Sequence, residues 1–261
     1  DENALRMQLG LDKPIFEQYT QYLVGLTQFD LGQSLFFQQP VSELIAERFP
    51  MTLQLAIMAL LVAVLIAFPL GIWAALRAGN WPDHLAMTVS LVGVSIPNFW
   101  LGPMLIMLFS LSLAWLPVSG AEQPYSWVLP AITLGTALAA ILARMLRASL
   151  LEVMHEDYIR TAQAKGLNSR LVYGKHALLN ALLPVVTILG LQLGTLLGGA
   201  VITEVVFDWP GLGQLLVESI QRRDYPVVQG CILVISIAYI TINGLTELVY
   251  AWIDPRIRVA Q

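Results

Sequence analysis

Charged residues and histidines divide the chain into long apolar stretches. Five stretches of 21 residues or more carry no Asp, Glu, Lys, Arg or His, apart from Glu247 in the last one. They cover residues 49–76, 85–121, 123–143, 177–203 and 225–253. A helix needs about 20 apolar residues to cross the hydrocarbon core of a bilayer. Each stretch therefore predicts one membrane span, and the five spans are expected at about 52–76, 86–114, 128–147, 180–203 and 228–252.

The same pattern fixes the fold class. A segment in lipid must satisfy its own backbone hydrogen bonds, so it is a helix or part of a closed barrel. The short alternating segments of barrel strands do not occur here. Hydrophobic residues make up 57% of the chain and charged residues 12%, with a mean hydropathy of +0.68. Soluble domains carry about 25% charged residues. These values predict an all-α integral membrane protein and exclude a soluble domain, a disordered chain and a nucleic-acid-binding surface.

The basic residues predict how the spans are oriented. Loops on the cytoplasmic side of a membrane carry an excess of Lys and Arg. Nine of the 14 basic residues lie in the loop at 77–84, in the region 144–176 or in the tail 254–261, and five lie in the other loops. Residues 1–50 are therefore expected outside as a small ordered segment, and residues 254–261 inside as a cytoplasmic tail. Because residues 1–50 show no signal peptide, we expect a sixth span upstream of this sequence.

Small residues recur at four-residue spacing in two of the predicted spans. Gly190, Gly194 and Gly198 lie about one helical turn apart in the fourth span. The third span repeats the pattern with Ala131, Gly135, Ala139 and Ala143. Such positions let two helices approach closely. The pattern predicts either tight packing around a transport pathway or the general packing of membrane helices.

Two other features lie inside predicted spans. Pro97 and Pro103 interrupt the second span and are expected to bend it. Glu247 is the one acidic residue well inside a span. A carboxylate there is either a pathway group that faces the bundle, or a group near the cytoplasmic interface that bonds locally, since Asp254 follows six residues later.

The loop at 148–179, on the predicted inside, contains a helix–turn–helix pattern. The sequence favours a helix up to Lys165, which Gly166 would end in a left-handed conformation. Asn168 would then start the next helix. Such an element is either a docking site for a partner protein or an ordinary amphipathic interfacial loop.

This loop resembles the cytoplasmic loop of the permeases of ABC importers. Their pattern is Glu-Ala-Ala, three residues, Gly and a later Leu-Pro; here Arg160-Thr161-Ala162, Gly166 and Leu183-Pro184 occupy these positions. The missing Glu and the longer distance to Leu-Pro are typical of the dipeptide, oligopeptide, glutathione and nickel branch. Further stretches that resemble this branch span nearly the whole chain and include Phe29–Ser34, Ser95–Phe99, Glu156–Tyr158, Trp209–Gly213, Arg223–Pro226 and Asp254–Arg256.

The resemblance implies a type I ABC-importer transmembrane domain and a set of partners. These are a second homologous permease subunit, two ATPase subunits, an extracytoplasmic substrate-binding protein and the lipid bilayer. Permeases of this family work by alternating access in the bacterial inner membrane. The residues expected to couple to the ATPase are Glu156, Asp157, Tyr158, Arg160, Thr161, Ala162, Lys165 and Gly166.

The outer segment 204–224 is expected near the mouth of the pathway and the binding protein. Its candidate residues are Trp209, Arg222, Arg223 and Asp224, with Glu247 as a further pathway candidate. The two arginines would meet an anionic substrate, or they would pair with Asp224 or with the binding protein.

The sequence provides no enzymatic site of its own. The P-loop that cradles ATP phosphates is missing, because Gly174-Lys175 is followed by His176 and lacks the upstream Gly. His155-Glu156 begins a zinc-protease pattern, but Ile159 stands where the second His is required. We therefore expect no cofactor on this chain, with ATP and Mg held by the partner ATPases. A channel would show a pore loop or rings of like charge, which are not evident.

The substrate stays open between small peptides, glutathione and nickel or a nickel chelate. Nickel favours imidazole, thiolate or carboxylate ligands. His84, His155 and His176 all lie on the predicted inside, away from the entry mouth. This favours peptides or glutathione over bare metal.

Overall fold

A computed structural model describes residues 13–253, and this part of the chain is almost entirely helical. The N-terminal positions 1–12 and the predicted cytoplasmic tail 254–261 lie outside the described residues. Within the described part, β pairing is limited to one isolated bridge between Gln33 and Pro40. The all-α prediction is confirmed. The helices are α2 (Ile15–Thr27), α3 (Val41–Leu76), α4 (Trp81–Ser95), α5 (Asn98–Leu105), η1 (Ile106–Ser112, π-helical), α6 (Val128–Met154), α7 (Asp157–Ala164), α8 (Ser169–Leu171), η2 (Val172–Ala177, π-helical), α9 (Leu178–Gly199), α10 (Val201–Val206), α11 (Leu212–Gln221) and α12 (Tyr225–Ile253).

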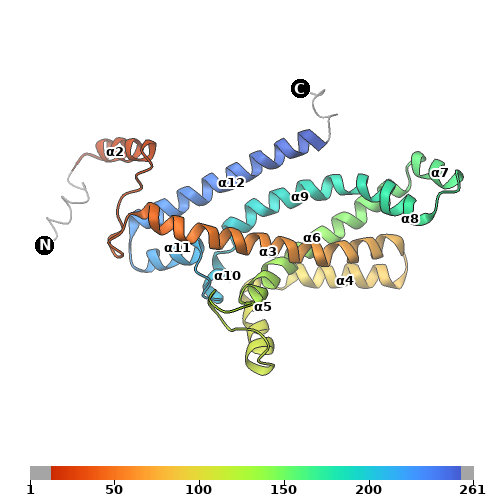
Figure 1. Cartoon of the computed structure of the whole chain (residues 1–261), viewed down its shortest axis with the longest axis horizontal. Helices are drawn as coiled ribbons and strands as arrows, with labels where there is room; N and C mark the ends of the chain where they lie inside the picture. Colours follow the sequence, from red (N-terminus) through yellow and green to blue (C-terminus); the bar gives the residue numbers. More distant parts are fainter. Residues whose placement is uncertain (1–12, 254–261) are drawn as a thin grey trace.

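Four helices of the described chain are long and apolar enough to cross a membrane. They are Val41–Leu76, Val128–Met154, Val172–Gly198 and Tyr225–Leu248, and the bent pair α4 and α5–η1 makes a fifth if it counts as one span. In Figure 1, α3, α6, α9 and α12 run along the long axis of the molecule. Helices α7 and α8 lie at one end, called here the α7 end, and α2 and α11 lie at the other, called the α11 end.

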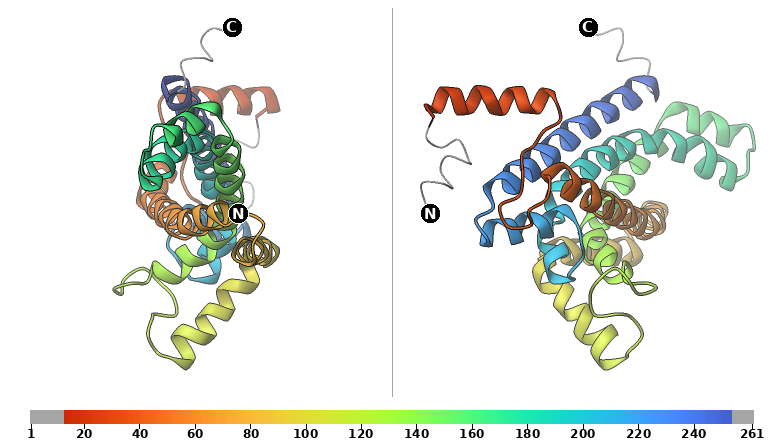
Figure 2. Two further views of the ribbon diagram at one scale, coloured as in Figure 1. Left: turned by 90° about the vertical axis from the view of Figure 1, so that its right-hand side faces the viewer. Right: turned by 60° about the vertical axis from the view of Figure 1, so that its left-hand side comes forward.

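The second predicted span is not one continuous helix. Helices α4 and α5–η1 meet at an angle of 100°. Pro97 has no N–H to donate to the preceding turn and disfavours helical geometry at the residue before it. Ile96 accordingly takes an extended conformation, with φ −85° and ψ 118°. The bend expected at Pro97 is therefore a full break, and α5 with η1 projects sideways from the bundle (Figure 2). Pro103 lies within α5, one turn before the π-helical stretch.

The helix bounds differ from the predicted spans mainly at the start of the bundle. Helix α3 begins at Val41, eleven residues before the predicted start of the first span at 52. The expected boundary of the N-terminal segment at residue 50 thus falls inside this helix. Charged residues such as Glu43 and Arg48 end the apolar stretch without ending the helix, so the apolar pattern alone did not predict where α3 begins.

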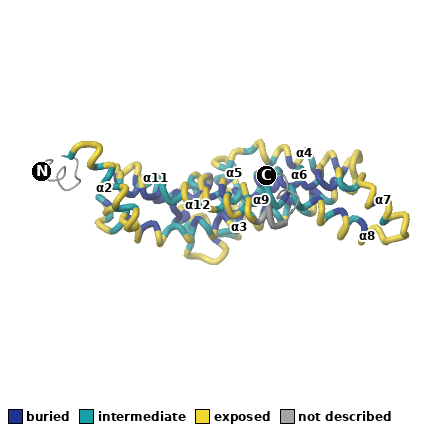
Figure 3. The backbone as a smooth tube through the Cα atoms, turned by 90° about the horizontal axis from the view of Figure 1, so that it is seen from above, coloured by how far each residue is buried: buried dark blue, intermediate teal, exposed yellow. Residues whose placement is uncertain are grey.

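The core of the bundle is a seam of small side chains between α3 and α6. Ala59, Ala63 and Ala67 of α3 are fully buried, as is Ala143 of α6. A Cβ atom at Gly135 of α6 would lie 2.7 Å from the carbonyl oxygen of Ala59. The backbones therefore approach within the distance that only small residues allow. Figure 3 shows the buried positions along the inner faces of these helices, with exposed positions on the outside.

Candidate functional site

The predicted coupling residues form a short helix at the α7 end. Glu156 precedes the first residue of α7 in an extended conformation. After the helix, Gly166 has a φ of +76°, and its N–H donates to the Gln163 carbonyl at 2.9 Å. The Leu167 N–H donates to the Ala162 carbonyl at 3.3 Å. These two bonds make a Schellman motif with glycine at the left-handed position, as the sequence predicts.

The second helix of this element also starts where the sequence places it. The Asn168 carbonyl accepts hydrogen bonds from the N–H groups of Leu171 and Val172, at 2.8 and 3.1 Å. Helix α8 then continues into η2 and α9 without interruption. The loop therefore joins the end of α6 to the start of α9 through a compact helix–turn–helix.

One side chain anchors α7 to the bundle. Ile159 is fully buried and packs in a cluster with Ala75 of α3, Leu150 of α6, Val172 of η2 and Ala181 of α9. Ala162 is half-buried against the same cluster. The element that the sequence predicts as a docking helix thus packs into a cluster that contains residues from the ends of three long helices.

The opposite face of α7 is polar and exposed. Arg160 pairs with Asp157 at 3.4 Å, with both side chains largely in solvent. The Thr161 hydroxyl donates to the Asp157 carbonyl at 2.9 Å. Lys165 and Glu156 are exposed as well. This face carries acidic and basic side chains that are exposed to solvent. Such a surface suits contact with another protein.

Tyr158 is the exception on this helix, because it contacts α9 instead of projecting freely. Its hydroxyl accepts a hydrogen bond from the Asn180 side-chain amide at 3.0 Å, and that amide also donates to the His176 carbonyl. The Tyr158 side chain is still 42% exposed. It therefore positions α7 against α9 while leaving part of its ring at the surface.

The glycines of α9 differ in what they do. A Cβ at Gly190 would lie 2.1 Å from Cγ2 of Thr246, and one at Gly194 would lie 2.9 Å from Oδ1 of Asn243. Both therefore allow α12 to lie close to α9. A Cβ at Gly198 would meet no atom within 4 Å among the described residues. The interhelical groove expected over three glycines thus involves two of them.

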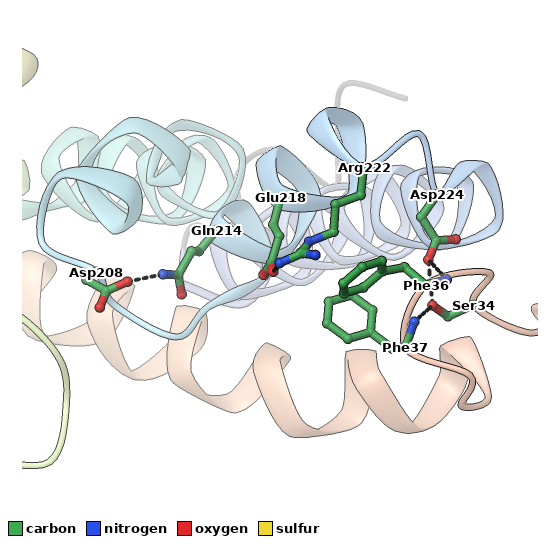
Figure 4. Close-up of polar contacts among 8 residues, drawn as sticks. All are labelled: Ser34, Phe36, Phe37, Asp208, Gln214, Glu218, Arg222 and Asp224. Carbon is green, nitrogen blue, oxygen red and sulfur yellow. Dashed lines mark hydrogen bonds and ion pairs between the residues drawn. The ribbon is translucent and has the colours of Figure 1, made fainter.

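At the α11 end, Asp224 joins the start of α12 to the N-terminal segment (Figure 4). Its carboxylate accepts a hydrogen bond from the Ser34 hydroxyl at 2.5 Å and others from the backbone N–H groups of Leu35 and Phe36, at 3.2 and 3.1 Å. Asp224 is fully buried. Three donors in a buried position satisfy the carboxylate, so it is a structural anchor on this chain.

The arginines beside Asp224 do not pair with it. Arg222 contacts Glu218 instead, at 2.8 Å, and its guanidinium lies 3.6 Å from the ring centroid of Phe36 (Figure 4). Arg223 is exposed, with a left-handed φ of +58°. Of the alternatives for these arginines, the pairing with Asp224 is wrong, because Ser34 and two backbone amides already occupy the carboxylate.

Trp209 is buried and does not line an open surface of this chain. It is 2% exposed, and its indole N–H donates to the Met51 carbonyl at 2.9 Å. Beside it lies Glu204, a residue that the sequence did not single out. Glu204 is fully buried and accepts hydrogen bonds from the Thr52 hydroxyl and from the N–H groups of Gly213 and Gln214. The sequence signal that could have identified Glu204 is its position five residues before the Trp209-Pro-Gly turn.

Burial raises the pKa of the Glu204 carboxyl above its ordinary value, although its three hydrogen bonds act in the opposite direction. The carboxylate caps the first turn of α11, where backbone N–H groups lack partners within the helix. A Cβ at Gly211 would lie 2.4 Å from this carboxylate. The glycine-rich turn therefore makes room for Glu204.

Glu247 lies on an exposed face of α12 and makes no polar contact with the rest of the described chain. Its carboxylate therefore does not face the interior of this subunit. No group of three or more His, Cys, Asp or Glu side chains suited to a metal occurs among the described residues.

Comparison with known proteins identifies the family. Residues 67–259 match the family described as "Binding-protein-dependent transport system inner membrane component". The chain is similar to the glutathione transport system permease protein GsiC of Escherichia coli (strain K12), with 48% identity over 254 residues that cover 97% of this chain and 83% of the relative. The protein of the same name from Salmonella paratyphi A (strain ATCC 9150 / SARB42) gives the same values.

Solved structures of ABC transporters share the fold. An inward-facing structure of the MetNI methionine ABC transporter matches with a TM-score of 0.69 at 19% identity, over 81% of this chain and 96% of that one. An amino acid ABC transporter with histidines matches with a TM-score of 0.62 at 16% identity, over 80% and 94% of the two chains. The resemblance found in the motifs is confirmed, and the chain belongs to the inner-membrane permease components of binding-protein-dependent ABC importers.

Proposed function

We propose that this chain is the permease subunit of an ATP-driven importer for small peptides, with glutathione as the preferred candidate. The observation that carries the substrate is the 48% identity to glutathione transport permeases over 97% of the chain. The 254 aligned residues include both the α7 end and the α11 end of this chain. The Lys and Arg distribution places the α11 end outside and the α7 end in the cytoplasm in this proposal.

In this proposal α7 is the coupling helix. Its exposed face, with Asp157, Arg160, Thr161 and Lys165, seats in a groove of an ATPase subunit. Closure of the ATPase dimer on ATP displaces α7, and Ile159 transmits the displacement to the ends of α3, α6 and α9. The bundle then alternates between inward-open and outward-open states. ATP and Mg belong to the partner, and this chain is non-catalytic.

The remaining partners occupy other exposed surfaces. Helices α5 and η1 expose large apolar side chains, among them Phe99, Trp100, Met107 and Leu111. Exposed apolar area of this extent belongs in lipid or against another membrane protein. We assign it to the bilayer and to the second permease subunit. The binding protein is assigned to the α11 end.

The nickel alternative is not favoured. The relatives quoted above carry glutathione in their names, and a bare metal ion would require His, Cys or carboxylate ligands along the path. An ATP-independent channel is a remote second candidate, and the preserved coupling element speaks against it. The two are separated by the energy requirement of uptake.

The test is uptake in intact cells with and without the full-length gene, with labelled glutathione, a dipeptide and nickel supplied in parallel. We expect loss of glutathione or dipeptide uptake alone. A matched strain carries the permease with a hydrolysis-deficient partner ATPase, and uptake is expected to be lost there too. Loss of nickel uptake alone would overturn the peptide assignment, and full uptake with the inactive ATPase would indicate a channel.

A further inference from the structure

A cavity with three polar side chains opens at the surface of the bundle, away from the coupling helix and the Asp224 anchor, with Asn98 and Gln192 half-buried and Thr195 exposed. It has a volume of about 180 Å³ and is bounded by the start of α5, the middle of α6 and the outer part of α9. Asn98, Gln192 and Thr195 supply its polar groups, and Ala, Leu and Ile side chains complete the wall. Both polar segments come from stretches without any charged residue or histidine. The cavity is therefore uncharged and mostly apolar, with three neutral polar side chains on its wall.

The carboxamides at this cavity are not used by the fold. Within the described chain, the side chains of Asn98 and Gln192 have no hydrogen-bond partner, and both are half-buried. The Thr195 hydroxyl donates to the Leu191 carbonyl at 3.1 Å, which leaves its oxygen free to accept. An unsatisfied polar group at membrane depth costs several kcal/mol. Two unpaired carboxamides and a free acceptor oxygen on one cavity indicate that something passing through the cavity satisfies them.

The break between α4 and α5 places one of these groups at the cavity. Asn98 is the first residue of α5, directly after Pro97 and the 100° bend. Non-helical backbone at membrane depth is tolerated where it lines a cavity or is buried in protein. An unbroken helix would carry residue 98 onward along the axis of α4. The break instead turns it toward α6 and α9, where Gln192 lies.

We propose that Asn98, Gln192 and Thr195 form one half of a hydrogen-bonding contact site on the translocation path, which takes the peptide groups of a short peptide. This inference rests on the proposed function and specifies where the solute contacts this subunit. A carboxamide offers one acceptor and two donors, and a peptide unit offers the complementary donor and acceptor. Hydrogen bonds without formal charge hold the solute weakly, which lets it leave.

Size indicates that the site is shared. Complete ligand pockets measure about 300–1,000 Å³, so about 180 Å³ is too small to enclose a tripeptide. The second permease subunit supplies the other wall. Because the three groups are neutral amide and hydroxyl oxygens and nitrogens, the site discriminates against a bare transition-metal ion, which favours imidazole, thiolate or carboxylate ligands.

The experiment measures glutathione transport by the complete importer in proteoliposomes, with saturating loaded binding protein. Gln192→Leu is expected to lower the transport rate about 3- to 10-fold, the effect of one or two lost hydrogen bonds. Thr195→Val is expected to lower it about 2- to 5-fold on the same basis. Thr187→Val is the matched control. The Thr187 hydroxyl donates to the carbonyl four residues earlier, that of Leu183, as Thr195 does to Leu191, but Thr187 does not line the cavity.

A second measurement compares two solutes in the same importer, so the comparison does not depend on how well a variant folds. A glutathione analogue with an N-methylated peptide bond is expected to move several-fold more slowly through the wild-type importer, and Gln192→Leu should remove most of that difference. Equal rates for all variants, or an N-methyl effect that Gln192→Leu leaves unchanged, would overturn the inference alone. A wild-type importer that moves neither glutathione nor dipeptides would overturn the proposed function instead.

Discussion

The carboxylate of Asp83 and the guanidinium of Arg147 form a two-point ion pair between α4 and α6. Nε of Arg147 lies 2.5 Å from Oδ1, and Nη2 lies 2.6 Å from Oδ2. Oδ2 also accepts a hydrogen bond from the Gly79 N–H at 2.9 Å. The Asp83 side chain is 2% exposed and that of Arg147 is 26% exposed. The pair thus fixes the turn between α3 and α4 to helix α6.

Loss of the arginine should destabilise the subunit strongly. Arg147→Met leaves a buried carboxylate without its counter-charge, which costs about 3 kcal/mol. We expect a clear drop in the thermal unfolding temperature of the detergent-solubilised protein. The double variant with Asp83→Asn should regain part of the loss, because no unpaired charge remains. Arg144→Met, three residues earlier on α6, is the control, and an equal loss there would contradict this role for the pair.

Substitution of Gly166 should uncouple transport from ATP hydrolysis. At a φ of +76° a side chain strains the backbone by about 1–2 kcal/mol, and a β-branched one by more. Gly166→Val is expected to leave assembly of the importer intact while lowering the solute moved per ATP hydrolysed. Gly174→Ala is the matched control, since a Cβ there also meets no atom within 4 Å but the residue has no positive φ. Unchanged uptake per ATP in Gly166→Val would refute the prediction.

The close contact between α9 and α12 should tolerate no side chain at Gly190. Gly190→Ala places a Cβ 2.1 Å from Cγ2 of Thr246, and such overpacking costs about 1–3 kcal/mol. The second variant Thr246→Ala removes the two nearest atoms and should restore part of the stability. Gly198→Ala should have little effect, because nothing lies near its Cβ position. The measurement is again thermal unfolding, and equal effects at residues 190 and 198 would show that the contact is not tight.

Glu204 should make the stability depend on pH in a defined direction. Because burial raises its pKa in the folded state, the folded protein binds the proton more tightly than the unfolded chain. Its contribution is then fully favourable below the ordinary pKa of 4.5 and is lost as the pH rises through the raised value.

The pH effect is isolated by comparing wild type with Glu204→Gln between pH 4.5 and 8. The variant keeps an acceptor for the α11 amides, and we expect a smaller loss of unfolding temperature toward pH 8 than in wild type. Parallel curves for the two proteins would exclude Glu204 as the source. Glu204→Ala should be destabilised by about 2 kcal/mol at every pH, because buried N–H groups lose their acceptor.

Local signals in the sequence predicted local structure well. Pro97 predicted the bend, since the missing N–H and the restriction on Ile96 act between neighbours. Gly166 predicted the end of α7 for the same kind of reason, because the left-handed cap depends on a single residue. The membrane spans followed from the length of the apolar stretches, whose physical cause is the bilayer itself.

Contacts between distant segments could not be predicted in this way. Asp224 finds Ser34 from 190 positions away, and Glu204 finds Thr52 from 152 positions away. Pairing of Arg222 with its neighbour Asp224 was therefore one of the alternatives that the sequence left open, although the fold gives that carboxylate other donors. Residue types and local spacing carry no information on such pairs. The polar cavity at Gln192 escaped notice for a similar reason, because its three groups come from two separate segments.

The seam between α3 and α6 limits how the subunit can move. Gly71 of α3 lies against the carbonyl oxygen of Ala143, and Gly135 of α6 lies against that of Ala59, so each helix contributes one glycine to the other's backbone. Sliding either helix along its axis would bring a methyl or larger group against a carbonyl that cannot move aside. The seam therefore resists sliding in both directions. During transport α3 and α6 move together as one rigid unit.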